Sequence, residues 1–171
     1  LNYLLEMRAS GRDRCEDYAD KFGVPFYKNQ KPWSVKVDIV MPCATQNEIG
    51  IKEAKQIIAN GTKYYIEVAN MPTTEEALNY LSDMDGVIVA PSKAVNAGGV
   101  CVSGLEMSQN SQRLSWTAEE VEEKLHNAMI NIHKHSVEAA EKYGLGYDLV
   151  AGANIAGFEK VAEAMMAQGI Y

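Results

Sequence analysis

The sequence predicts an α/β fold built on a parallel sheet, with two further helices toward the carboxyl end. Three short apolar segments, at residues 37–41, 64–69 and 87–90, alternate with three segments of helical pattern. This alternation is typical of parallel strands joined by helical crossovers. With 171 residues, the chain is long enough for one hydrophobic core and too short for two ordinary domains.

The amino-terminal residues 1–22 are expected to form a helix that is interrupted at Gly11. Residues 24–27 predict a short strand, which Pro25 would place near an edge because proline has no N–H to donate to a neighbouring strand. The sequence begins at Leu1, without a methionine and inside a predicted helix. We therefore expect the chain to be a fragment of a longer protein.

The three central strands are predicted from β-branched, aromatic and aliphatic residues bounded by turn residues. Segment 87–90 lies between Asp85-Gly86 and Pro91 and is apolar throughout, as expected for a strand buried on both faces. The helices that follow the strands are expected at 48–59, 74–81 and 96–113, and Asn60-Gly61 should end the first of them.

Two long helices, at 118–143 and 154–168, complete the expected fold and should pack outside the sheet. In the first of them, apolar residues recur at spacings of three, four and seven, which predicts one buried stripe. The stripe consists of Val121, Leu125, Ala128, Ile132, Ala139 and Tyr143.

Three predicted helices begin with the pattern Thr-x-x-Glu, which is typical of a capping box. The pairs are Thr45 with Glu48, Thr73 with Glu76, and Thr117 with Glu120. The pattern at Thr117 indicates a structural role alone. The other two threonines follow the carboxyl ends of predicted parallel strands, where ligands of open α/β sheets bind.

The segments that follow the three strands, at 42–47, 70–74 and 91–96, share a proline with neutral amide or hydroxyl side chains. Such groups suit a carboxamide, a ribose or a carboxylate, and parallel strands would bring them to one shared cleft. Asn96 and Ser103 are seven residues apart, so on a helix both side chains would lie on the same face. Gly99 lies between them on that face and, having no side chain, would leave space there. The alternative is that Gly98 and Gly99 serve tight helix packing.

The charge pattern and the cysteines exclude several function classes. The net charge is −7 and no cluster of Lys and Arg is present, which argues against a nucleic-acid partner. No apolar run reaches the roughly 20 residues that span a bilayer, so no membrane partner is expected. Cys15, Cys43 and Cys101 have no metal-type spacing, and their odd number favours a reducing, cytoplasmic compartment.

The sequence offers few ionisable groups for catalysis near the predicted cleft. The strand-end segments contain no histidine, no carboxylate pair and no nucleophile beside a base. Lys93 is a candidate catalytic lysine, but a solvated lysine in a strand-to-helix turn is the favoured interpretation. His126, His133 and His135 are expected to be exposed side chains of one helix rather than metal ligands.

Four segments together resemble the carboxyl-terminal part of hexameric bacterial glutamate dehydrogenases. They are PCATQNE at 42–48, EVANMPTT at 67–74, NAGGVCVSGLEMSQN at 96–110 and GANIAGF at 152–158. The resemblance extends over essentially the whole chain and implies a Rossmann-type sheet. Residues 1–115 would form a partial dinucleotide-binding domain that lacks its first βαβ unit. Residues 116–171 would be helices that pack on it and toward an absent substrate domain.

The resemblance also implies an activity, which is the reversible NAD(P)-dependent oxidative deamination of L-glutamate to 2-oxoglutarate and ammonia. By the same analogy, Ser103 would bind the side-chain carboxylate of glutamate, and Asn96 would contact the nicotinamide carboxamide. Asn70 and the Ala44-Thr45-Gln46 loop would border the nicotinamide and its ribose. The catalytic lysine and aspartate of the family would precede Leu1, so we expect no catalytic residue here and no activity of this chain alone. The cofactor would be NAD or NADP, and the intact protein would be a homo-hexamer.

Two alternatives remain beside this interpretation. Related dehydrogenases of branched-chain or aromatic amino acids share the Asn-Ala-Gly-Gly helix but have an apolar residue at the place of Ser103. A buried hydroxyl without a polar partner would cost about 1–3 kcal/mol, so Ser103 favours glutamate as the substrate. A non-catalytic α/β regulatory module is the other alternative.

Overall fold

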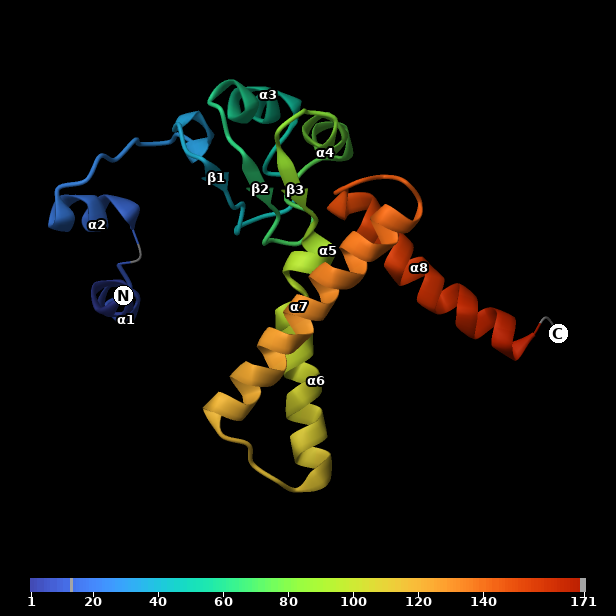
Figure 1. Ribbon diagram of the computed structural model, residues 1–171. Helices are drawn as coiled ribbons and strands as arrows, with labels where there is room; N and C mark the ends of the chain where they lie inside the picture. The colour runs from blue at the N-terminus through green and yellow to red at the C-terminus, as the bar shows by residue number, and fades with distance from the viewer. Residues whose placement is uncertain (13, 170–171) are drawn as a thin grey trace. The chain divides into compact units, whose positions relative to one another are not determined.

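The computed structural model describes residues 1–12 and 14–169. The chain divides into two compact units, Leu1–Pro32 and Trp33–Tyr171, which are drawn in Figure 1. A 3-10 turn, Pro32–Ser34, spans the boundary between them. The division at residue 115 that the resemblance implies stays a prediction.

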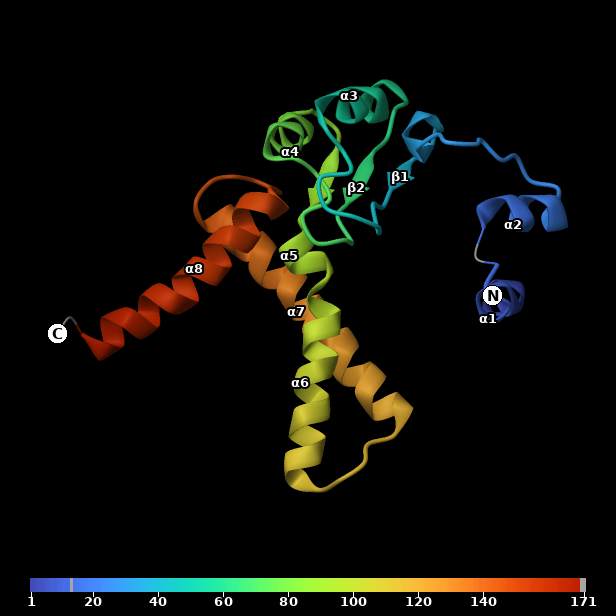
Figure 2. The same ribbon diagram turned by 180° about the vertical axis from the view of Figure 1, so that it is seen from behind.

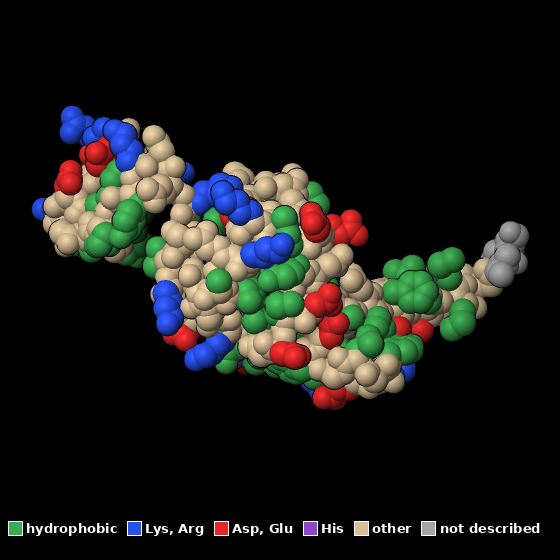
Figure 3. Space-filling view, turned by 90° about the horizontal axis from the view of Figure 1, so that it is seen from above, with side chains coloured by type: hydrophobic (Ala, Val, Ile, Leu, Met, Phe, Trp, Pro, Cys, Tyr) green, Lys and Arg blue, Asp and Glu red, His purple; other side chains and the backbone are tan. Residues whose placement is uncertain are grey.

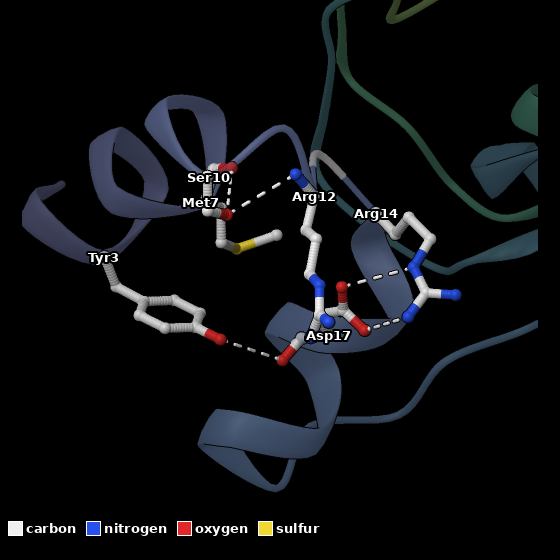
Figure 4. A network of polar contacts seen from close by, with 6 residues as sticks. All are labelled: Tyr3, Met7, Ser10, Arg12, Arg14 and Asp17. Atoms are coloured by element: carbon white, nitrogen blue, oxygen red, sulfur yellow. Dashed lines mark hydrogen bonds and ion pairs between the residues drawn. The ribbon is translucent and has the colours of Figure 1, made fainter.

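The first unit contains two short helices, α1 at Asn2–Ala9 and α2 at Cys15–Phe22. Gly11 has a φ of +70°, which ends the first helix and confirms the expected interruption. The Arg14 guanidinium donates to the Asp17 carboxylate at 2.5 and 3.2 Å, and Tyr3 Oη donates to the Asp17 carbonyl oxygen, as Figure 4 shows. The hydrogen bond from Arg14 lowers the pKa of Asp17 below its usual value.

The strand expected at residues 24–27 is wrong, because these residues have no regular structure. The backbone N–H of Val24 donates to the Ala19 carbonyl oxygen and so belongs to the end of α2. Gly23, with a φ of +64°, turns the chain there. Pro25 has no N–H, so this short segment has too few free backbone donors to pair with a neighbouring strand.

The second unit contains a parallel sheet of three strands in the order β1-β2-β3. The strands are β1 at Ile39–Val40, β2 at Tyr64–Ile66 and β3 at Ile88–Ala90. Val40 pairs with Tyr65, and Tyr65 pairs with Val89. The predicted α/β class and the parallel sheet are confirmed, although each strand is shorter than predicted.

Two helices that follow β1 and β2 cover the sheet and form the core with it. They are α3 at Ile51–Ala59 and α4 at Glu75–Ser82. Figures 1 and 2 show both helices beside the strands from opposite viewpoints. The core consists of buried side chains from all these elements and the loop before α3: Val40, Ile49, Ala54, Ile57, Tyr65, Ala77, Leu81 and Val89.

The helix expected from residue 96 starts earlier and is broken at Asn96. The structure has a short helix α5 at Ser92–Val95 and a longer helix α6 at Ala97–Gln112, with Asn96 between them. Helix α7, Ala118–Lys142, returns beside α6 (Figures 1 and 2). A Cβ added to Gly98 would lie 3.4 Å from Leu125 Cδ1, so this glycine faces α7.

The last helix, α8, spans Leu149–Gln168 and begins five residues before its predicted start at Asn154. The Asp148 carboxylate accepts the Ala151 N–H at 2.9 Å and caps the helix. The buried side chain of Ala139 confirms part of the predicted stripe on α7. Tyr143 is 56% exposed, and its hydroxyl donates to Glu159 at 2.9 Å, so the stripe ends before Tyr143.

From residue 158 onward, α8 has exposed apolar side chains, visible as green atoms on the right of Figure 3. Phe158 is 70% exposed and Met166 is 76% exposed, and Val161 and Met165 are exposed beside them. No helix within residues 1–12 and 14–169 is long and apolar enough to cross a membrane.

Candidate functional site

The loops after β1 and β2 lie side by side, as the sequence predicted for the ends of parallel strands. The Asn47 N–H donates to the Met71 carbonyl oxygen, and the Ile49 N–H donates to the Pro72 carbonyl oxygen, both at 3.0 Å. The Ala69 N–H donates to the Pro42 carbonyl oxygen at 2.9 Å. These backbone bonds join the two loops along their length.

A pair of asparagine side chains joins the loop after β2 to the helix turn after β3. Asn96 Nδ2 donates to Asn70 Oδ1 at 2.6 Å. Within the part of the chain that the structure describes, Asn96 Oδ1 and Asn70 Nδ2 have no hydrogen-bond partner in the protein. The pair therefore offers one acceptor and one donor group, the two kinds of group that a primary carboxamide requires.

The side chains of Ala44, Thr45 and Gln46 are exposed in the loop after β1. The predicted capping box of Thr45 with Glu48 is wrong, because α3 begins only at Ile51. Glu53 Oε2 accepts the Gly50 N–H at 3.1 Å instead. Asn47, with a φ of 52°, bends the chain between the loop and α3, and this bend leaves Thr45 outside the helix.

Thr73 is buried and does not cap α4, so the predicted box with Glu76 is also wrong. The helix cap is Thr74, and Thr73 is 3% exposed. Thr73 Oγ1 and the hydroxyl of Tyr65 are 2.6 Å apart in a hydrogen bond. Burial raises the pKa of Tyr65 well above its usual value. The Tyr65–Thr73 pair thus anchors the loop after β2 to the strand beneath it.

Ser103 lies on α6, two helical turns after Asn96, and is exposed. Its hydroxyl donates to the Gly99 carbonyl oxygen at 3.1 Å, so Ser103 and Asn96 are not hydrogen-bonded to each other here. The Ser103 hydroxyl is therefore neither buried nor without a polar partner in this chain. A Cβ added to Gly99 would meet no atom within 4 Å among the described residues, so helix packing accounts for Gly98 but not for Gly99.

Lys93 is exposed, and its ammonium donates to Asn154 Oδ1 on α8. The contact joins the turn after β3 to the last helix. Asn154 lies in the 152–158 segment that carries the resemblance, but no sequence pattern marks it as a partner of Lys93. His133 Nε2 is 2.7 Å from the Tyr147 hydroxyl, and all three histidines are exposed.

The whole described chain, and not only the site, matches one family. The model of the Glutamate/Leucine/Phenylalanine/Valine dehydrogenase family matches residues 1–169. The chain belongs to this family.

Individual dehydrogenases of the family are similar to the chain over nearly all of its length. The NAD-specific glutamate dehydrogenase of Clostridium symbiosum is 69% identical over 170 residues, which is 99% of this chain. The NADP-specific glutamate dehydrogenase of Escherichia coli (strain K12) is 53% identical over 170 residues. A solved structure of a glutamate dehydrogenase has a TM-score of 0.94 and 69% identity over 99% of this chain. The chain spans 38% of the length of each of these three proteins.

Proposed function

We propose that the chain is the part of a glutamate dehydrogenase that holds the nicotinamide of NAD or NADP together with glutamate. The intact protein would catalyse the reversible oxidative deamination of L-glutamate to 2-oxoglutarate and ammonia. The single observation that carries this proposal is the Asn70–Asn96 pair, which joins two strand-end loops and keeps an amide acceptor and donor free. The names of the similar dehydrogenases support the same reaction.

The donor set of the site fits the nicotinamide ring's carboxamide. Asn96 Oδ1 and Asn70 Nδ2 would bind its amide, and the exposed Ala44-Thr45-Gln46 loop would border the ring and the ribose. When bound, the nicotinamide supplies hydride transfer. The protein contributes orientation in a neutral environment, because these loops contain no histidine and no carboxylate pair.

Ser103 would bind the side-chain carboxylate of glutamate. Its hydroxyl would exchange the Gly99 carbonyl oxygen, a neutral acceptor, for a carboxylate oxygen. This exchange is favourable because hydrogen bonds to charged acceptors are about twice as strong as neutral ones. The open position at Gly99 supports the approach of a ligand to this face of α6.

We assign no catalytic residue within this chain. Lys93, the ionisable side chain considered from the sequence, binds Asn154 through its ammonium. Hydride transfer requires substrate and nicotinamide to be held in near-attack geometry, and the chain spans 38% of the length of its relatives. We therefore expect the 171-residue chain alone to be inactive with glutamate and either dinucleotide.

Assembly and domain organisation are also part of the proposal. In the intact protein, residues 1–115 would belong to the dinucleotide-binding domain, and the helices of 116–171 would contact further polypeptide. The exposed Phe158, Met165 and Met166 on α8 support such a contact. The resemblance supports a homo-hexamer, and the three free cysteines support a cytoplasmic location.

The experiment that tests the proposed function uses the full-length dehydrogenase of which this chain is a part. Ser103→Ala should lower kcat/KM for L-glutamate by roughly 10- to 100-fold, because a hydrogen bond to a charged group contributes about 1.5–3 kcal/mol. The activity of wild type and variant with L-leucine should be low and equal.

Ser108→Ala is the matched control, because Ser108 is also exposed on α6 and donates to the carbonyl oxygen four residues earlier, at 2.8 Å. This variant should keep the wild-type kcat/KM for L-glutamate. Equal effects of the two substitutions would contradict the assignment of Ser103. A wild-type preference for leucine over glutamate would favour the branched-chain alternative.

A further inference from the structure

Glu67 is a buried acidic residue beside the proposed site, with no part in the function described so far. It follows β2 directly and is 3% exposed. Its backbone N–H donates to the Ala90 carbonyl oxygen at 3.0 Å, and its Oε2 accepts the Ser92 N–H at 3.0 Å. Burial of a carboxyl group is unfavourable unless its oxygens are hydrogen-bonded, so the bond to Ser92 is a specific feature of this place in the fold.

The bond from Ser92 to Glu67 is one link in a closed ring that contains both asparagines of the site. Ser92 is the first residue of α5, and its carbonyl oxygen accepts the Asn96 N–H at 2.9 Å. Asn96 Nδ2 then donates to Asn70 Oδ1 at 2.6 Å. Asn70 is three residues after Glu67 in the chain, so the backbone closes the ring.

The backbone part of the ring is itself held in place by the loop after β1. The N–H groups of Val68 and Ala69, which lie between Glu67 and Asn70, both donate to the Pro42 carbonyl oxygen, at 3.2 and 2.9 Å. This side of the ring is therefore attached to the sheet. The other side, α5 with Asn96, follows Ala90, which accepts the Glu67 N–H, and is joined to the first side through two side chains, Glu67 and Asn70.

We propose that Glu67 is a positioning residue for the nicotinamide carboxamide. It holds the start of α5 so that Asn96, at the other end of this four-residue helix, meets Asn70. The inference rests on the proposed function of the asparagine pair. Glu67 itself is buried against Ser92 and does not contact a ligand, so it acts through Asn96 and not on the reacting atoms.

Removal of the Glu67 acceptor has a defined consequence for the ring. The Ser92 N–H would lose its acceptor in a partly buried place, and α5 would shift to bring it to water. Because α5 is a single short turn, Asn96 would move with it. The ADP half of the cofactor would be unaffected, since the ring borders only the proposed nicotinamide position.

The test uses the full-length dehydrogenase with two substitutions at one position. Glu67→Leu has a similar size but no acceptor, whereas Glu67→Gln keeps an oxygen that can accept the Ser92 N–H. Glu67→Leu should raise the KM for the dinucleotide by about tenfold or more, since small misplacements of binding groups have large effects. The dinucleotide KM of Glu67→Gln should stay within about threefold of the wild-type value. The dissociation constant of ADP-ribose, which lacks the nicotinamide, should stay within about twofold for both variants.

A further variant, Ser92→Pro, removes the donor of the same bond and keeps the inference testable if Glu67→Leu fails to fold. Proline is well tolerated at the first position of a helix, and Pro91 already has the extended backbone that favours a following proline. Ser92→Pro should raise the dinucleotide KM as Glu67→Leu does, with ADP-ribose binding unchanged.

Asn70→Ala and Asn96→Ala in the same enzyme distinguish a failure of the proposed function of the asparagine pair from a failure of the proposed role of Glu67. If neither raises the dinucleotide KM, the proposed function of the pair is wrong. If both raise it while Glu67→Leu and Ser92→Pro leave it at the wild-type value, the role of Glu67 is wrong. An equal loss of ADP-ribose and dinucleotide binding in Glu67→Leu would also overturn the inference, because it would indicate a general structural role.

Discussion

Gly152→Ala is expected to destabilise the packing of α8 against α7. Gly152 is buried in α8, and a Cβ at this position would overlap the Ser136 carbonyl oxygen of α7. The Cβ would also lie 2.8 Å from the Ser136 carbonyl carbon and 3.2 Å from Ala140 Cβ. Backbone atoms cannot rotate out of the way as a long side chain can, so the two helices must separate.

The expected size of the effect follows from two opposing contributions. Alanine is about 1 kcal/mol more favourable than glycine in a helix interior. Overpacking costs about 1–3 kcal/mol, and the upper end applies here because the overlap is with backbone. The net expectation for Gly152→Ala is a loss of about 2 kcal/mol in the free energy of unfolding.

Gly157→Ala provides a matched control in the same helix. A Cβ at Gly157 would meet no atom within 4 Å among the described residues. This variant should therefore gain up to about 1 kcal/mol from helix propensity alone. Equilibrium urea unfolding followed by circular dichroism would measure both variants, with an expected difference of about 3 kcal/mol between them. Equal stability of the two variants would refute the packing argument.

Two further predictions concern residues whose roles the structure distinguishes. Thr117→Ala should lower the free energy of unfolding by about 1 kcal/mol, because Thr117 Oγ1 accepts the Glu120 N–H at 3.2 Å. Thr45 lies outside any helix, so Thr45→Ala should change the free energy of unfolding by less than about 0.5 kcal/mol. Urea unfolding measures both variants, and equal losses of stability would contradict the prediction. Tyr65→Phe should be less stable than wild type below about pH 10, and this difference should shrink as the pH rises further. The reason is that the raised pKa of Tyr65 keeps the buried phenol protonated in the folded state while the unfolded chain loses the proton. Unfolding experiments at several alkaline pH values measure the difference, and a constant difference would contradict the expectation.

The local sequence was sufficient for the parallel sheet and for several local features of the fold. The parallel sheet, the interruption at Gly11 and the capping box at Thr117 each depend on residues close together in the chain, and all three were predicted. The convergence of the strand-end loops followed from the geometry of parallel strands. The pairing of Asn70 with Asn96 is a contact between residues 26 apart, and no local pattern specifies it.

Two of the errors occurred where a contact outside the local segment decides the structure. Thr73 matches a capping pattern, but the Tyr65 hydroxyl on the preceding strand, β2, gives it a buried partner instead. The start of α8 was missed because Gly152 lowers the helix propensity of this segment, whereas packing of Gly152 against α7 offsets that cost in the fold. A signal for Glu67 was present, since it is the one acidic residue in the apolar segment 64–69.

The most direct test of the central claim is a double-mutant cycle on Asn70 and Asn96 in the full-length dehydrogenase, with the dinucleotide KM and kcat measured at saturating L-glutamate. If the two amides bind one carboxamide as a pair, each single alanine substitution should by itself raise the dinucleotide KM nearly as much as the double substitution does. ADP-ribose binding should be unchanged in all three variants. Strictly additive effects, or KM values equal to that of the wild type, would contradict the account.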